Sequence, residues 1–202
     1  MRKIIQKVYK FDELSEKAKE KAIEKYRKGN LDYEWWDSSF DDFKEIGKLM
    51  GIKIDNIYFS GFYSQGDGAC FEGSYDYNKG SVKAIKKYAP KDKELHQIAI
   101  NLSKLQRPYF YKIGAVIKHS GHYSNEYCTD IELFSDNYIK GNYIEFNLTT
   151  ETEDAFIEEL RNFMRWIYKQ LEQEYKFLQS DKQIIESIKA NDYEFYEDGK
   201  MY

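Results

Sequence analysis

Two loops of the sequence carry the side chains best suited to bind a ligand or to take part in chemistry. The first, residues 60–69, is rich in glycine and polar groups, and the second, residues 119–125, holds two of the three histidines. Glycines let backbone N–H groups approach a ligand closely, and such turns can bind anions such as phosphate. Amide, carboxylate and imidazole groups would add directional hydrogen bonds, and tyrosine rings could stack on a base. The candidate binding residues are therefore Tyr63, Gln65, Gly66, Asp67, Gly68, His119, His122, Tyr123 and Asn125.

Three of these residues, Asp67, His119 and His122, have the composition of a metal site built from two histidines and one carboxylate. A histidine here could instead act as a general base on a phosphodiester, because its pKa lies near the working pH. His-x-x-His spacing in a loop is a weak metal signal, however, and no third group can be named that would orient a base. A plain Asp-Gly turn with solvated histidines also fits these residues. We therefore favour binding over catalysis at these loops and expect no metal and no cofactor.

The aromatic content suggests a second kind of binding feature. Aromatic residues make up 17% of the chain, led by 19 Tyr and 13 Phe. Tyrosine is amphipathic, so it suits both half-buried strand faces and contact surfaces. The adjacent Trp35 and Trp36 would lie about 100° apart on a helix, so both cannot occupy the centre of one apolar stripe. Trp35 is therefore a candidate anchor for a protein partner, with partial burial of both rings as the alternative.

Charge and cysteine usage exclude several classes of protein. The net charge of −4 comes from 31 basic and 35 acidic residues that are mixed along the chain, without the basic stripe of a nucleic-acid binder. Cys70 and Cys128 form neither a zinc motif nor a disulfide framework. The first residues are too polar for a signal peptide, and no apolar run is long enough to span a membrane. We expect a cytoplasmic protein with reduced thiols that binds neither membranes nor duplex nucleic acid.

Each candidate loop joins two segments that alternate like β-strands. The first hairpin comprises residues 52–62 and 69–77, and the second comprises residues 109–118 and 126–134. If the first strand runs up, its partner runs down, and two intervening helices return the chain so that the third strand runs up again. Both loops should then lie at the same edge of one antiparallel sheet, with Asp67 near His119.

Helical periodicity accounts for most of the remaining chain. The expected order is β-α-α-β-β-α-α-β-β-β-α-α-β, with a third strand of the same sheet at residues 143–148 and a terminal hairpin at Asp198-Gly199. This pattern predicts an α+β fold, in which helices pack on one face of an antiparallel sheet of about five or six strands. We expect residues 1–150 to form the core domain. Residues 151–202 should add helices and the terminal hairpin to the same domain.

The glycine-rich segment FSGFYSQGDGACFEG, residues 59–73, resembles a group of phage and prophage hypothetical proteins. Some of these carry the label of antitoxins of a toxin–antitoxin stability system. The likeness extends to residues 8–15, to residues 118–121 and to the tail at residues 190–199, so it covers most of the chain. It implies an accessory protein of a mobile element, and it carries over no catalytic residue. Small phage proteins of this kind often bind and disable a host factor, including bacterial immune systems such as CRISPR effectors or cyclic-nucleotide signalling.

Three functions follow from the residues and this resemblance. The first is a binding protein that inhibits a host defence component, either by blocking a host protein or by sequestering a nucleotide-like ligand. The second is a small phosphodiester hydrolase that uses His119, His122 and Asp67. The third is an antitoxin that neutralises a cognate toxin. The sequence favours the first.

Overall fold

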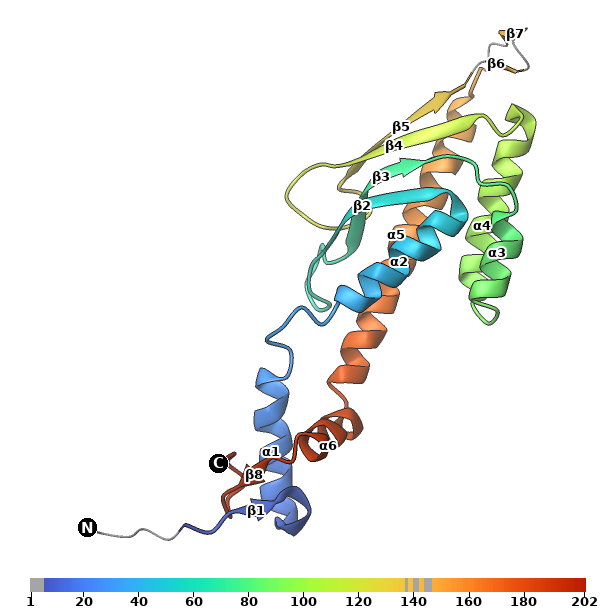
Figure 1. The fold of residues 1–202 in the computed structure, drawn as a ribbon. Coiled ribbons are helices and arrows are strands. Elements are labelled where there is room, and N and C mark those ends of the chain that lie inside the picture. Colours follow the sequence, from blue (N-terminus) through green and yellow to red (C-terminus); the bar gives the residue numbers. More distant parts are fainter. Residues whose placement is uncertain (1–5, 137, 140–141, 144–146) are drawn as a thin grey trace. The chain divides into compact units, whose positions relative to one another are not determined.

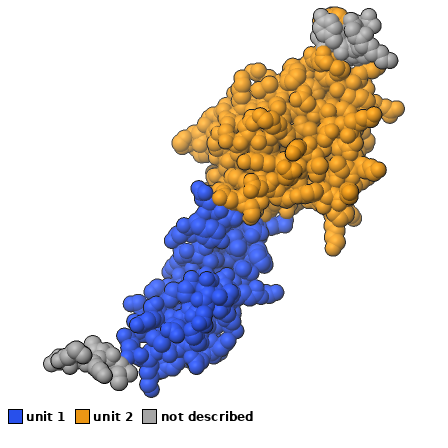
Figure 2. All heavy atoms as spheres, in the orientation of Figure 1, with its two compact units in different colours: residues 1–35, 172–202 blue, residues 36–171 orange. Residues whose placement is uncertain are grey.

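The computed structural model describes residues 6–136, 138–139, 142–143 and 147–202. The chain divides into two compact units, shown in Figure 2. Unit 1 combines residues 1–35 with residues 172–202, and unit 2 comprises residues 36–171. The two ends of the chain lie in the same unit because they contribute to the same small core. The α+β class predicted from the sequence is confirmed.

The main sheet of unit 2 has four antiparallel strands in the order β2-β3-β4-β5. The strands are β2 (Ile52–Phe59), β3 (Ala69–Tyr75), β4 (Ile113–His119) and β5 (Thr129–Ser135). On β3, Ala69, Phe71 and Tyr75 are buried as the alternation predicted, but Cys70 on the opposite face is buried as well, so the strand does not alternate cleanly between buried and exposed residues. A β-bulge between Ile54 and Asn56 interrupts the pairing of β2 with β3.

Helices pack on one face of this sheet, as Figure 1 shows. They are α2 (Asp37–Met50), α3 (Ser81–Tyr88), α4 (Lys93–Gln106) and the long α5 (Thr150–Leu178), with a 3₁₀ turn η2 (Arg107–Tyr109) after α4. Helix α5 supplies much of the core, because the ring of Phe163 packs edge-on against Phe71 and that of Phe156 lies beside Tyr75. The side chain of Asp92 caps α4 by accepting the N–H of Leu95 at 2.9 Å.

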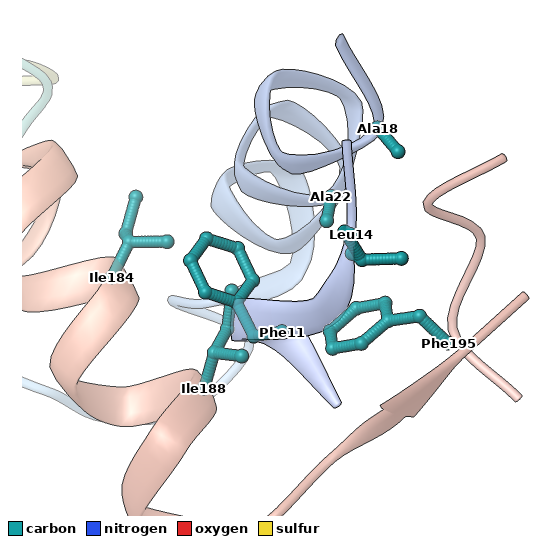
Figure 3. Close-up of a cluster of buried hydrophobic side chains, with 7 residues drawn as sticks. All are labelled: Phe11, Leu14, Ala18, Ala22, Ile184, Ile188 and Phe195. Atoms are coloured by element: carbon teal, nitrogen blue, oxygen red, sulfur yellow. The ribbon is translucent and has the colours of Figure 1, made fainter. Parts of the chain in front are cut away.

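Unit 1 joins the two ends of the chain. It contains β1 (Tyr9–Lys10), the 3₁₀ turn η1 (Phe11–Glu13), α1 (Glu16–Gly29), α6 (Asp181–Ala190) and β8 (Glu194–Phe195). Strand β1 pairs with β8, and the predicted terminal hairpin is confirmed by the bridge from Phe195 to Met201. Figure 3 shows the core of this unit, to which both ends of the chain contribute: Phe11, Leu14, Ala18, Ala22, Ile184, Ile188 and Phe195.

Two details differ from the sequence-based expectation. Among the described residues the main sheet has four strands rather than five or six, and Tyr143, the first residue of the strand predicted at 143–148, does not belong to it. Instead β7 (Asn142–Tyr143) pairs with β6 (Tyr138–Ile139) in a small sheet of its own, because a connection of two residues costs little loop entropy. Residues 144–146 of the predicted strand lie outside the described residues.

Within the described part of the chain, every helix is too short or too polar to cross a membrane.

Candidate binding site at two hairpin loops

The loop between β2 and β3 touches the loop between β4 and β5. The side-chain amide of Asn125 donates a hydrogen bond to the carbonyl oxygen of Gly66 at 3.1 Å. A β-carbon placed on Gly66 would lie 3.7 Å from the ring of Tyr123, and one placed on Gly68 would lie within 2.5 Å of the Asn125 β-carbon. The prediction that both loops lie at one edge of the sheet is therefore confirmed.

Asp67 organises the first loop from within. Its carboxylate accepts the backbone N–H groups of Tyr63 at 2.9 Å and Ser64 at 2.7 Å. Two hydrogen bonds between Ser60 and Gly68 close the base of the loop. The N–H of Ser60 donates to the carbonyl oxygen of Gly68 at 3.1 Å, and the N–H of Gly68 donates to the hydroxyl of Ser60 at 3.2 Å. A carboxylate that accepts two backbone N–H groups fixes the shape of a turn. Asp67 thus has a clear structural role, and Gln65 is exposed beside it.

His119 occupies the end of β4, where its ring stacks on that of Tyr58 with the centroids 4.5 Å apart. Its Nε2 atom lies 3.0 Å from the carbonyl oxygen of Tyr123. A carbonyl can only accept, so Nε2 carries the proton and Nδ1 is the acceptor in the neutral ring. The imidazole therefore ties the second loop back to the end of its own strand.

A hydrogen-bonded group that the sequence did not single out lies beside His119. The carboxylate of Glu72 accepts the amide of Asn56 at 3.1 Å and the hydroxyl of Tyr58 at 2.9 Å. These bonds, chiefly that from Asn56, lower the pKa of Glu72, and the backbone and charge of His119 act in the same direction. The bond to Glu72 in turn raises the pKa of Tyr58. The only sequence signal was the alternation of β3, which places Cys70, Glu72 and Ser74 on one face.

The joined loops present a tyrosine rim, which we define as Tyr63, Tyr123 and Tyr127. Their side chains are 78%, 60% and 68% exposed, respectively. His122 is also exposed, and its ring lies 5.6 Å from that of Tyr123. The guanidinium of Arg161 lies 5.2 Å from the centre of the Tyr127 ring, a cation–π distance. Tyr127 was assigned to a strand from the sequence, but β5 begins only at Thr129.

Trp35 does not belong to this site, and its prediction as an exposed anchor is wrong. The indole is only 9% exposed, and it packs in unit 1 with its centre 5.9 Å from the ring of Tyr175. Helix α2 begins at Asp37, so the argument from helical spacing did not apply to the two tryptophans. The other nine predicted binding residues all lie in or beside the two loops.

Asp67 and His119, which the metal and hydrolase alternatives both use, have hydrogen-bond partners of their own. The structure's described residues contain no group of three histidine, cysteine or acidic side chains placed to hold a metal ion. Asp67 bonds within its own loop and His119 bonds to a main-chain carbonyl, so neither orients the other as a catalytic pair would require. What the two loops share is that each carries exposed tyrosine and that a hydrogen bond joins them.

Comparison with known protein families finds a match. A family described as a domain of unknown function, DUF8835, matches residues 35–181, which include both loops and all of unit 2. No curated protein and no solved structure matches the chain.

Proposed function

Since the chain belongs to the DUF8835 family of domains of unknown function, we propose a role for it from the loop geometry. The protein is a non-catalytic binding protein that engages a partner protein through the tyrosine rim. The observation that carries this proposal is the gathering of three highly exposed tyrosines on two loops that brace each other. Tyrosine gives large contact area at low cost in side-chain entropy, and it is enriched at the energetic centres of interfaces.

The bracing matters because a preorganised surface loses less entropy on binding than a loose one. Asp67 holds the first loop, His119 ties back the second, and Asn125 links the two. These residues support the rim rather than contact the partner. Gln65 and His122 are exposed and would add hydrogen bonds at its border.

The nature of the partner rests on the resemblance to phage and prophage proteins. It favours a host defence protein, such as a CRISPR effector, that the chain disables by direct binding. Sequestration of a nucleotide-like signal is the second form of the same role, because exposed tyrosine rings can stack on bases. Neutralisation of a toxin remains the third form, and it would use the same surface.

The test compares two triple variants of equal severity. The rim variant replaces Tyr63, Tyr123 and Tyr127 by serine. The control replaces Phe110, Phe134 and Tyr143, which are also exposed aromatics of unit 2, by serine. We expect the wild type and the control to retain one stoichiometric protein from an extract of host cells, and the rim variant to lose it. Equal retention by both variants would contradict the proposal.

A second arm separates binding from hydrolysis. The protein is incubated with cyclic oligonucleotides, and both retained ligand and new products are measured. Stoichiometric retention without products supports ligand sequestration. Turnover that His119→Ala abolishes would establish the hydrolase instead and end the proposal of a non-catalytic protein.

A further inference from the structure

The chain carries a local concentration of positive charge that its net charge of −4 conceals. Residues 79–93, which cover α3 and the start of α4, contain six lysines and a single acidic residue, Asp92. The lysines are Lys79, Lys83, Lys86, Lys87, Lys91 and Lys93. Such a segment favours an anionic ligand over a cationic or neutral one.

A pocket of about 400 Å³ opens at the N-terminal end of α3. Its position is away from the two hairpin loops, because Tyr77 follows β3 at the opposite end of that strand from residues 60–68. The pocket is lined by Tyr77, Gly80, Ser81, Lys83, Lys86 and Ser103. None of the lining residues in the described chain is acidic.

The first turn of α3 has backbone N–H groups without an acceptor among the described residues, and they lie at the N-terminal end of the helix, where the pocket opens. Gly80 is the N-cap, with φ +87° and no side-chain cap. The N–H of Ser81 bonds to Asn78 and that of Ala84 bonds to Gly80, whereas the N–H groups of Val82 and Lys83 have no partner among the residues that the structure describes. Free N–H groups and the helix dipole make a helix N-terminus attractive to anions.

Ser81 gives an independent indication that a ligand belongs here. The residue is 94% buried (6% exposed) and lines the pocket, yet its hydroxyl makes no hydrogen bond within the described structure. The hydroxyl oxygen is not one of the fully buried polar atoms that lack a partner among the described residues, so it remains open to the pocket and to a ligand there. Lys83 and Lys86 likewise form no ion pair with any described residue. The pocket is thus lined by donors of three kinds that have no acceptor among the described residues.

We propose that this pocket binds the phosphate group of a small phosphorylated ligand. The hydroxyl of Ser81 and the N–H groups of Val82 and Lys83 bond to phosphate oxygens, and the ammonium groups of Lys83 and Lys86 balance their charge. The volume exceeds that of phosphate alone and falls in the range of small-molecule sites. The ring of Tyr77, held by stacking on Tyr111 at 4.4 Å, offers a wall for the body of the ligand. This site is independent of the tyrosine rim.

Amide chemical shifts and calorimetry on the full chain test the site. Inorganic phosphate, adenosine monophosphate and glucose 6-phosphate are the probes, and adenosine is the uncharged control. We expect phosphate to shift the amide signals of Val82 and Lys83. Tighter binding of the adenosine phosphate would identify an aromatic ligand body, and tighter binding of the sugar phosphate would identify a polar one. Absence of shifts at both amides with every phosphate probe would overturn the proposal.

Three lysine variants separate a built site from general attraction to a basic surface. Lys83→Gln and Lys86→Gln should each weaken binding of the adenosine phosphate about tenfold, the loss expected for one charge-assisted bond. Lys87→Gln removes the same charge from the same helix, but Lys87 does not line the pocket, so affinity should be kept. All three side chains are exposed, and the fold should survive. Equal weakening by all three variants, or binding of an oligonucleotide alone, would contradict a small-ligand site.

Discussion

The backbone of Gly68 lies so close to Asn125 that a β-carbon on residue 68 would stand 2.5 Å from the β-carbon of Asn125. Real β-carbons do not approach one another so closely. The requirement for glycine here comes from this contact between the two loops, since residue 68 does not adopt the left-handed conformation. The absence of a side chain at Gly68 therefore allows the second loop to pack against the first.

Gly68→Ala should separate the loops and destabilise unit 2 by about 1–3 kcal/mol, the usual cost of overpacking. Urea unfolding measures the loss, and backbone hydrogen exchange at residues 60–68 and 119–128 should quicken. Gly61→Ala is the matched control, because its added β-carbon would meet Asp67 at an ordinary 3.4 Å. Equal effects of the two substitutions would show that the contact at residue 68 is not specific.

The pKa of Glu72 should rise when Tyr58 is replaced by phenylalanine. The lost hydroxyl is one of two donors that stabilise the Glu72 carboxylate, and Asn56 remains as the other. A lowered pKa in the folded state means that the group stabilises the protein at neutral pH and that this contribution is lost as the pH falls through the folded pKa. Carbon-13 titration of the Glu72 carboxyl group measures the shift. An unchanged titration would contradict the role given to Tyr58.

Gln106→Leu should destabilise the protein by about 3 kcal/mol or more, because it would leave buried polar groups unpaired. Gln106 is fully buried, and its amide bonds to both the N–H and the carbonyl of Ile113 and to the hydroxyl of Tyr75. Gln97→Leu makes the same change on an exposed face of the same helix and should cost far less. Chemical denaturation of the two variants checks the difference, and similar midpoints would refute it.

The thiol of Cys70 should resist alkylation in the native protein. It is 1% exposed, and burial raises its pKa to about 12, so it stays protonated at neutral and mildly alkaline pH. Cys128 is only partly buried and should react first with iodoacetamide. Mass spectrometry of Cys128→Ser, which leaves Cys70 alone, gives the rate directly. Rapid labelling of this variant without unfolding would show that Cys70 is accessible.

Much of the architecture follows from local sequence signals. The terminal turn at Gly199 lies where the Asp-Gly signal predicted it. Helix α4 begins after Asp92 and α2 ends at Gly51, and both residue types are typical of those helix ends. The position of both loops at one sheet edge followed from strand direction alone. These features depend on neighbours in sequence or on simple connectivity, so a single sequence is enough to predict them.

The parts that were not predicted depend on contacts between distant residues. The hydrogen bond from Tyr58 to Glu72 joins strands β2 and β3, whose pairing is shifted by a β-bulge. The alternation of side chains in the sequence does not reveal that bulge. The burial of Trp35 depends on Tyr175, which is far along the chain. The pocket at Ser81 forms where α3 meets Ser103 of α4, and two of its donors are backbone N–H groups, which leave no pattern in the sequence.

Strand β1 pairs with β8, so the first strand to be synthesised cannot pair until the last one has been made. Residues 36–171 are translated before the last strand exists, so unit 2 can assemble on the ribosome while the first helix still lacks its packing partners. Until residues 172–202 emerge, Leu14 and the apolar face of α1 formed by Ala18 and Ala22 lack the side chains against which they pack in the folded unit. The first segment to be synthesised, which includes α1, is thus the last to have its apolar side chains buried. Chaperone binding to the nascent chain should concentrate on this segment.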